Sequence, residues 1–233
     1  MTLTVNSPTS KPSHNGTNAA AKSLLKDQAY VELKRLILDA TFSPGDFLSE
    51  RQLAERLTMS KTPVKAALQR LESEGFIAVS PQQGIVVRDL TIHEIADQFE
   101  IRLALESHVL RTVAGKLTDA ETKRLRENLT AQRGMVTTHD YTRAVELDAD
   151  FHMMICEFHG NQEFIRVMSQ LRERMHRVIA RVFEQDTNRM AASVEEHAAI
   201  ADAVVAGDAD LAAQCIKEHL DYGKQFLLTP RRR

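Results

Sequence analysis

Four side chains in the second half of the sequence have the residue types and spacing of a metal site. Asp148 and His152 are four residues apart, so they lie on the same face of a helix. That face also carries apolar residues, and an unpaired carboxylate among them is costly to remove from water. A cationic partner, hydrogen bonds or a metal ion is the usual compensation. We therefore treat this pair as half of a candidate metal site.

A second pair, His197 and His219, flanks the helix break at Gly207-Asp208 almost symmetrically. Each histidine is about ten residues from the break, or roughly 16 Å along its helix at ~1.5 Å per residue. Two antiparallel helices joined at this break would therefore hold both imidazoles at the same height. One carboxylate and three imidazoles suit a divalent ion, with zinc as the first choice and manganese, nickel or iron as alternatives. The competing interpretation is four satisfied core residues, because Asp-x-x-x-His spacing is common by chance.

The elements that must position these groups are predicted to be helices. Beyond residue 90 no strand signal is convincing, and amphipathic periodicity predicts six helices at about 91–115, 118–136, 141–159, 161–185, 190–206 and 208–228. This pattern predicts an all-α six-helix bundle over residues 91–229, which would hold the candidate metal site. His159 and His176 are weaker pocket candidates and are assigned structural roles.

The first part of the sequence predicts a different unit. Residues 1–26 lack apolar periodicity and are expected to form a disordered tail. Residues 27–88 contain three helical segments, with a turn at 42–46 and a Ser49 capping pattern before the second helix. The third helix, expected to start at the Thr62-Pro63 dipeptide, runs to Gly75.

Two β-prone runs, 76–79 and 85–87, follow this helix and predict a small β-hairpin wing. The order is that of a winged helix-turn-helix, whose second helix enters the DNA major groove. The predicted DNA-facing residues are Arg51, Ser60, Lys61, Thr62, Lys65, Gln83 and Gly84. Each of them alone is more often an ordinary solvated residue, so the prediction depends on their convergence. The fold class is therefore mostly α, with a small wing.

The composition narrows the class of protein. The chain has 233 residues, of which 43% are hydrophobic and 27% charged, and this indicates a soluble, helix-rich protein. No apolar run approaches the roughly 18 residues of a membrane span, and the start lacks a signal-peptide core, so we expect a cytoplasmic protein without a membrane partner. Cys156 and Cys215 are interpreted as small core residues. The net charge of −2 does not indicate a nucleic-acid partner, so we expect dimerisation to contribute to DNA affinity.

Residues 44–55 (PGDFLSERQLAE) and 60–75 (SKTPVKAALQRLESEG) resemble the DNA-binding signature of GntR-family regulators. The resemblance implies operator contacts from Arg51, Lys61, Thr62 and Lys65, assisted by the wing tip at Gln83 and Gly84. Positions 61 and 65 usually carry arginine in that family. Lysine is a flexible point charge without the planar guanidinium fork, so the base preference is expected to differ.

The segments 100–106 (EIRLALE) and 148–152 (DADFH), with His197 and His219, resemble the FCD effector domain of the FadR-type branch. Six helices rather than seven resemble the VanR-like subgroup. The resemblance implies that Asp148 and the three histidines bind a metal, and that Arg102 pairs with an effector carboxylate. An octahedral ion with four protein ligands has two positions left for water or that carboxylate. Without the resemblance, Arg102 would be interpreted as a salt-bridge partner of Glu106.

Three hypotheses follow from these patterns. The leading one is a homodimeric regulator, a repressor by expectation, that binds double-stranded operator DNA and senses a small carboxylate metabolite beside a metal ion. A metal-dependent hydrolase or related enzyme is the second, although the Asp/His cluster lacks a placed general base. The third is a metal sensor, in which the ion itself is the signal. We expect that the protein is not an enzyme.

Overall fold

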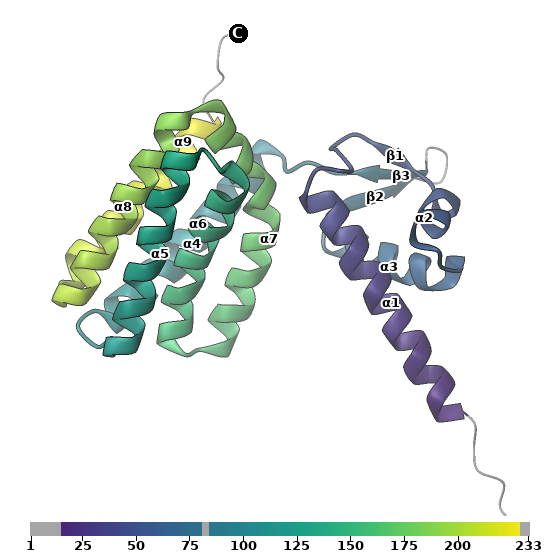
Figure 1. The fold of residues 1–233 in the computed structure, drawn as a ribbon, viewed down its shortest axis with the longest axis horizontal. Helices are drawn as coiled ribbons and strands as arrows, with labels where there is room; N and C mark the ends of the chain where they lie inside the picture. The colour runs from purple at the N-terminus through teal and green to yellow at the C-terminus, as the bar shows by residue number, and fades with distance from the viewer. Residues whose placement is uncertain (1–14, 81–83, 229–233) are drawn as a thin grey trace, which may run out of the picture. The chain divides into compact units, whose positions relative to one another are not determined.

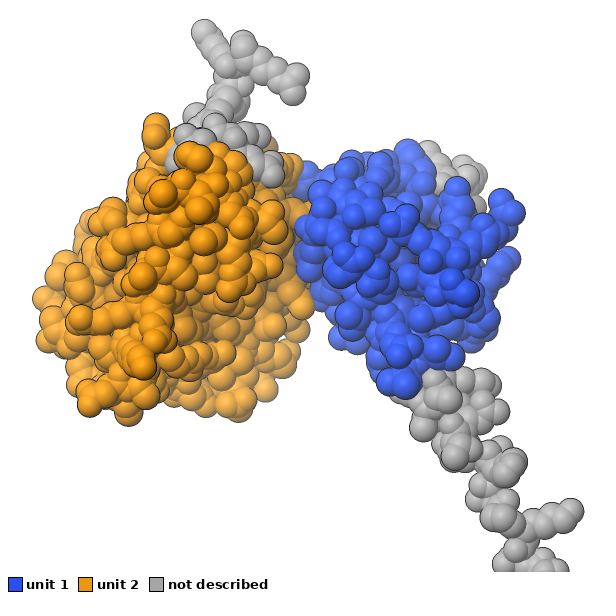
Figure 2. Space-filling view, in the orientation of Figure 1, with its two compact units in different colours: residues 1–89 blue, residues 90–233 orange. Residues whose placement is uncertain are grey.

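The chain forms two compact units, residues 1–89 and 90–233, each with its own hydrophobic core (Figures 1 and 2). The computed structural model describes residues 15–80 and 84–228. Among the described residues, no helix is long and apolar enough to cross a membrane.

Over residues 15–80 and 84–89, the first unit consists of three helices and a small antiparallel sheet (Figure 1). Its elements are α1 (Asn15–Leu38), β1 (Phe47–Leu48), α2 (Glu50–Leu57), α3 (Lys61–Ser73), β2 (Ile77–Ser80) and β3 (Gly84–Val87). Helix α1 packs on α3, and apolar residues from all three helices and from β2 and β3 form the core. This arrangement is the predicted winged helix-turn-helix.

The sheet differs from the prediction by one strand. The predicted hairpin is present, with Ile77 opposite Val87 and Ser80 opposite Gly84, but β1 pairs with the other edge of β3. A strand of two residues is too short to show an alternating pattern, so sequence periodicity does not reveal it. The expected wing tip at Gln83 lies outside the described residues.

Two helix starts in the first unit also differ from expectation. Helix α1 begins at Asn15, so the second half of the segment expected to be a tail is helical. Alanine and lysine are frequent there, and their high helix propensity outweighs the missing apolar periodicity. Helix α3 begins at Lys61, with Ser60 rather than Thr62 at the N-cap. Pro63 still lies in the first turn, where a missing N–H costs no helical hydrogen bond.

The second unit is a bundle of six helices among the described residues, which confirms the mostly α fold class (Figure 1). The helices are α4 (Ile92–Val113), α5 (Asp119–Thr138), α6 (Tyr141–His159), α7 (Gln162–Gln185), α8 (Thr187–Ala206) and α9 (Ala209–Leu228). Capping boxes at Thr91 and Thr118 fix the starts of α4 and α5.

The turn between α8 and α9 positions two of the candidate ligands. Gly207 ends α8 with a φ of +82°, a left-handed conformation that favours glycine. A Cβ atom on Gly207 would lie only 3.4 Å from the Cα atom of Gly115. The Gly115 backbone N–H donates to the Val204 carbonyl at 2.9 Å, which ties this turn to the end of α4. The predicted antiparallel hairpin therefore forms, and its turn is held tightly.

Candidate functional site

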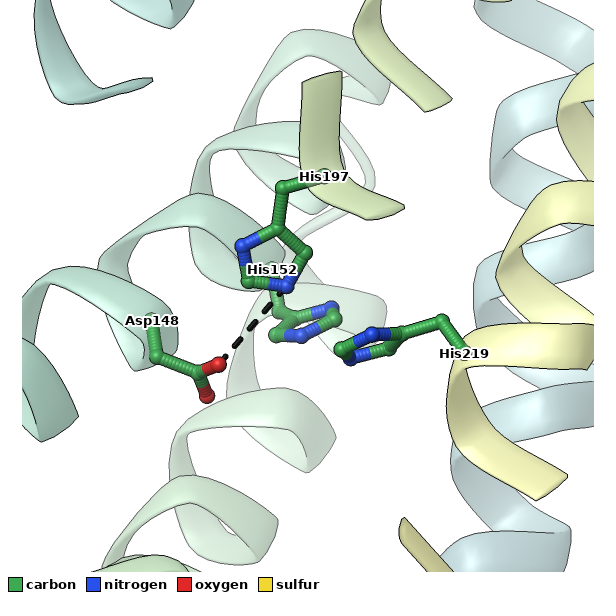
Figure 3. A group of neighbouring side chains, drawn as sticks. All are labelled: Asp148, His152, His197 and His219. Carbon is green, nitrogen blue, oxygen red and sulfur yellow. Dashed lines mark ion pairs between the residues drawn. The ribbon is translucent and has the colours of Figure 1, made fainter. Parts of the chain in front are cut away.

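The structure brings Asp148, His152, His197 and His219 together inside the second unit. Helix α6 carries the first two, α8 carries His197 and α9 carries His219. All four side chains are buried, and one potential ligand atom from each lies within 4.8 Å of the others. Figure 3 shows the carboxylate and the three imidazoles gathered around a common centre. The ring centroids of His197 and His219 are 4.6 Å apart, so the two histidines do stand at the same height.

Two of the imidazoles have a buried ring nitrogen that makes no hydrogen bond to the described residues. The Nε2 atoms of His152 and His197 are buried and have no hydrogen-bond partner among the described residues. Nδ1 of His152 lies 2.6 Å from a carboxylate oxygen of Glu106, and Nδ1 of His197 lies 2.9 Å from the amide oxygen of Gln132. Because these oxygens accept hydrogen bonds, each Nδ1 is the donor, and the Nε2 lone pair remains available. That tautomer is the form in which histidine binds a metal, so these residues fit a divalent ion.

His219 is oriented in the same way by a different helix. Its Nδ1 atom lies 2.7 Å from Glu196, which also accepts hydrogen bonds of 2.6 and 2.5 Å from Arg189. Burial opposes ionisation of Glu196, but its hydrogen bonds to Arg189 and His219 outweigh this and lower its pKa to about 2. The Arg189 guanidinium lies 4.2 Å from the ring centre of Tyr222. Glu196 is thus a fixed carboxylate that orients His219.

Glu106 links the candidate metal site to Arg102. Its side chain is fully buried, and besides His152 it accepts a hydrogen bond of 2.8 Å from Arg102 Nε. Burial would raise the pKa of Glu106, but its interactions with His152 and Arg102, which both donate hydrogen bonds to it, lower it to about 2. The carboxylate therefore stays ionised and holds both partners. The expected salt bridge between Arg102 and Glu106 is present, and it fixes the orientation of the arginine side chain.

His197 and His219 are in the neutral protonation state that metal binding requires. Burial, followed by the neighbouring imidazoles, lowers the pKa of His197 well below its usual value. Burial also lowers the pKa of His219. Both rings are therefore neutral near pH 7, and neutral imidazole is the form that binds metals. Asp148 accepts a hydrogen bond of 3.2 Å from the Ser193 hydroxyl and lies 3.6 Å from His197 Nε2.

A cavity opens beside this cluster. It is lined by Arg102, Asp148 and His152 on one side and by residues of α7 on the other. About 20 Å³ of it is accessible to the centre of a water molecule, which is room for roughly one water. The predicted effector residue and two candidate metal ligands thus face one space.

The residues that accept hydrogen bonds from the histidine Nδ1 atoms were not predicted from the sequence. Gln132 lies on α5, far in sequence from His197. Glu196 is adjacent to His197 in sequence, yet its partner is His219. No spacing rule predicts such contacts, because they depend on how the helices pack. The pairing of Arg102 with Glu106, four residues apart, was the one signal present.

Two carboxylates that lie near the cluster in sequence, Glu196 and Glu157, are engaged in ion pairs. Glu196 is held by Arg189 and His219, and Glu157 forms an ion pair of 2.8 Å with Arg124 at the surface. Neither carboxylate is placed to activate a water at the cluster. The enzyme hypothesis therefore has no support from the site.

Five of the seven predicted DNA-facing residues are exposed at the surface of the first unit. They are Arg51 on α2, Ser60 before α3, and Lys61, Thr62 and Lys65 on α3. The opposite face of α3 is buried in the core through Val64, Ala67, Leu68 and Leu71. Arg51 lies 3.7 Å from Glu55 in a loose ion pair. The positive charges of Arg51, Lys61 and Lys65 are therefore accessible to an external partner such as DNA phosphate.

The backbone at position 84, at the start of β3, requires glycine. Its φ is +85°, and a Cβ atom there would lie 3.1 Å from the Leu48 carbonyl oxygen. The glycine lets β1 approach β3, whether or not it also contacts DNA.

Each of the two units matches a known protein family. Residues 25–87 match the model of "Bacterial regulatory proteins, gntR family", and residues 97–222 match that of the FCD domain. The "HTH-type transcriptional repressor RspR" of Escherichia coli is 26% identical over 196 residues, covering 84% of this chain and 86% of that protein. The "Nta operon transcriptional regulator" of Aminobacter aminovorans is 29% identical over 181 residues, covering 77% and 83%.

A similar fold is found in a solved structure, that of a putative transcriptional regulator GntR from Rhodococcus sp. RHA1. Its TM-score is 0.78, with 23% sequence identity and coverage of 89% of this chain and 99% of that one. At this identity the likeness shows the fold alone. The families and relatives are transcriptional regulators and not enzymes. The chain therefore belongs to the GntR family of bacterial transcriptional regulators and carries an FCD domain.

Proposed function

We propose that this regulator is a homodimeric repressor whose operator affinity is controlled by a small carboxylate bound beside a divalent metal ion. The observation that carries the proposal is the pair of buried Nε2 atoms, on His152 and His197, that lack a partner among the described residues. Leaving two such atoms unpaired is costly unless something occupies the centre between them. A bound ion removes this cost.

The proposed ligands of the ion are Asp148, His152, His197 and His219. Zinc is the first choice, and manganese, nickel and iron are alternatives, because all accept imidazole with a carboxylate. When bound, the ion supplies a Lewis-acidic position for a carboxylate oxygen. Arg102 lines the adjacent cavity, and its Nε is already bound to Glu106, so its terminal nitrogens are the groups we assign to the acid.

The proposed DNA contacts are those of Arg51, Ser60, Lys61, Thr62 and Lys65, with the wing tip at Gln83 and Gly84. A dimer would place two such helices against half-sites about one DNA turn apart, in the cytoplasm where the chromosome lies. The relative RspR is named a repressor, which supports the same sign here.

The test is a fluorescence anisotropy titration of metal-loaded protein with its own promoter region and with random DNA. We expect preference for the promoter, and weaker binding when a small acid is added. Equal binding to both DNAs would contradict the proposal. Release of DNA by chelation alone, with no effect of any acid, would instead identify a metal sensor.

A further inference from the structure

The cavity beside the candidate metal site has an apolar wall. Helix α7 contributes Met168, Leu171, Met175 and Ile179, and Val145 of α6 adds to them. The lining also includes Arg102 of α4 and Asp148 and His152 of α6. A ligand whose carboxylate lies at the metal end must therefore rest its body against methyl and thioether groups.

The charges around the cavity admit one negative charge from a ligand. Arg102 is balanced by Glu106, and Arg172 on α7 is balanced by Asp150 at 2.8 Å. A divalent ion with Asp148 as its charged ligand leaves one positive charge. A monoanion neutralises this site, whereas a dianion would bring a second charge into an apolar cavity, which is costly.

Polar groups on the far wall are few. His176 lines the cavity, and its Nδ1 atom is buried without a hydrogen-bond partner among the described residues. Burial lowers the pKa of His176, so the ring is neutral and offers a hydrogen bond rather than a charge. Arg172, which pairs with Asp150 through one terminal nitrogen, is the other polar residue that α7 contributes to the lining. A ligand with many hydroxyl groups would leave most of them unpaired here.

From these observations we infer that the effector is a monocarboxylate with a compact apolar body, aromatic or branched aliphatic, that carries at most one hydroxyl group. The inference rests on the proposed function and narrows the ligand class of that site. It excludes sugar acids, dicarboxylates and tricarboxylates.

The size of the cavity sets a further condition. With room for roughly one water molecule, it must widen before such an acid enters. Met168 and Met175 form part of the wall, and methionine is the side chain that repacks most readily. Ligand entry is therefore expected to move the α7 side chains and to leave the hydrogen-bonded histidines in place.

The experiment is isothermal titration calorimetry of the full-length, zinc-loaded protein with six acids. Benzoate, 4-hydroxybenzoate and isovalerate represent the inferred class, and gluconate, succinate and citrate represent the excluded classes. We expect at least one acid of the first group to bind at least about tenfold more tightly than every acid of the second. Gluconate, succinate or citrate binding as tightly as the first group would overturn the inference.

The outcomes also separate this inference from the proposed function. Tight binding of a polar acid that releases DNA would refute the inference alone and leave the acid-responsive regulator standing. Absence of binding by all six acids, with no change in DNA affinity, would refute both.

A matched pair of variants tests the apolar wall. Met175→Gln keeps the length of the side chain but places an amide in the cavity, whereas Met153→Gln makes the same change in the core on α6, away from the cavity lining. We expect Met175→Gln to weaken the tightest apolar acid about tenfold and acetate less than about twofold, because acetate reaches only the metal end. Met153→Gln should change neither affinity. Equal losses in both variants would show a general packing defect and contradict a direct contact.

Discussion

The predicted DNA-facing surface and the candidate metal site differ in burial and in what holds their side chains in place. The first consists of exposed side chains close together in sequence, from Arg51 to Lys65, which lie on α2, on α3 and in the turn between them. The second consists of four buried side chains from three helices, and each histidine is held by a further partner. Substitutions on the surface should therefore change DNA binding without changing stability. Substitutions in the buried site should change metal affinity and stability together.

The largest expected effect is the loss of a ligand from the buried site. His152→Ala removes one of the two unpaired Nε2 atoms, and we expect zinc affinity to fall by at least ~100-fold, beyond the loss typical of an outer partner. Competition with a chelator and elemental analysis measure this. His108→Ala, on the exposed face of α4, is the control and should retain stoichiometric zinc. Unchanged zinc content in His152→Ala would remove this residue from the site.

A smaller effect is expected at an outer partner. Glu196→Gln keeps the shape of the side chain but removes the charge that orients His219 and pairs with Arg189. We expect zinc affinity to fall by about 10- to 100-fold. Glu195→Gln, the neighbouring exposed carboxylate, is the control. If both variants bind zinc equally, orientation of His219 by Glu196 does not matter for binding.

On the DNA-facing surface, Lys65→Ala should weaken operator binding about tenfold, which corresponds to roughly 1.4 kcal/mol. Its thermal midpoint and zinc content should stay unchanged, because Lys65 is exposed and makes no core contact. Lys123→Ala, on the exposed surface of α5, controls for the loss of one positive charge. A loss of stability in Lys65→Ala would break the contrast between the two regions.

The smallest effect concerns the acid stability of the first unit. Burial raises the pKa of Glu74, but its contacts with Lys34, Tyr30 and Arg70 outweigh this, so the pKa is lowered. The stabilisation is therefore present above the unfolded-state pKa, about 4.3, and is lost as pH falls below it. Glu74→Gln should lower the free energy of unfolding by about 1 kcal/mol at pH 7. The difference from wild type should shrink toward pH 3 in denaturant titrations, and a constant difference would contradict this role.

How far sequence predicts each region follows from the same contrast. The winged helix is predicted well because Ser49, Pro63 and the apolar face of α3 act within a few residues of one another. Strand β1 was missed because two residues show no periodicity. In the bundle, the symmetry of His197 and His219 about Gly207 was enough to bring them together, since a helical hairpin has a fixed rise per residue.

What sequence did not predict are the contacts that only packing creates. Gln132 and Glu196 have no spacing relation to the histidines they orient, and the apolar wall of α7 resembles any other buried helix face. Arg102 was predicted to be a salt-bridge partner or an effector ligand. The structure places it in contact with Glu106 and at the cavity at once.

The central claim is that the buried site in the second unit controls DNA binding by the first. The most direct measurement is the operator affinity of wild type and His219→Ala by anisotropy, with and without the tightest-binding acid of the calorimetric panel. We predict that the acid weakens wild-type binding by at least about tenfold, within the usual range of coupling energies. The variant should bind the operator within about threefold of wild type and not respond to the acid. A variant that keeps the full wild-type response would contradict the account.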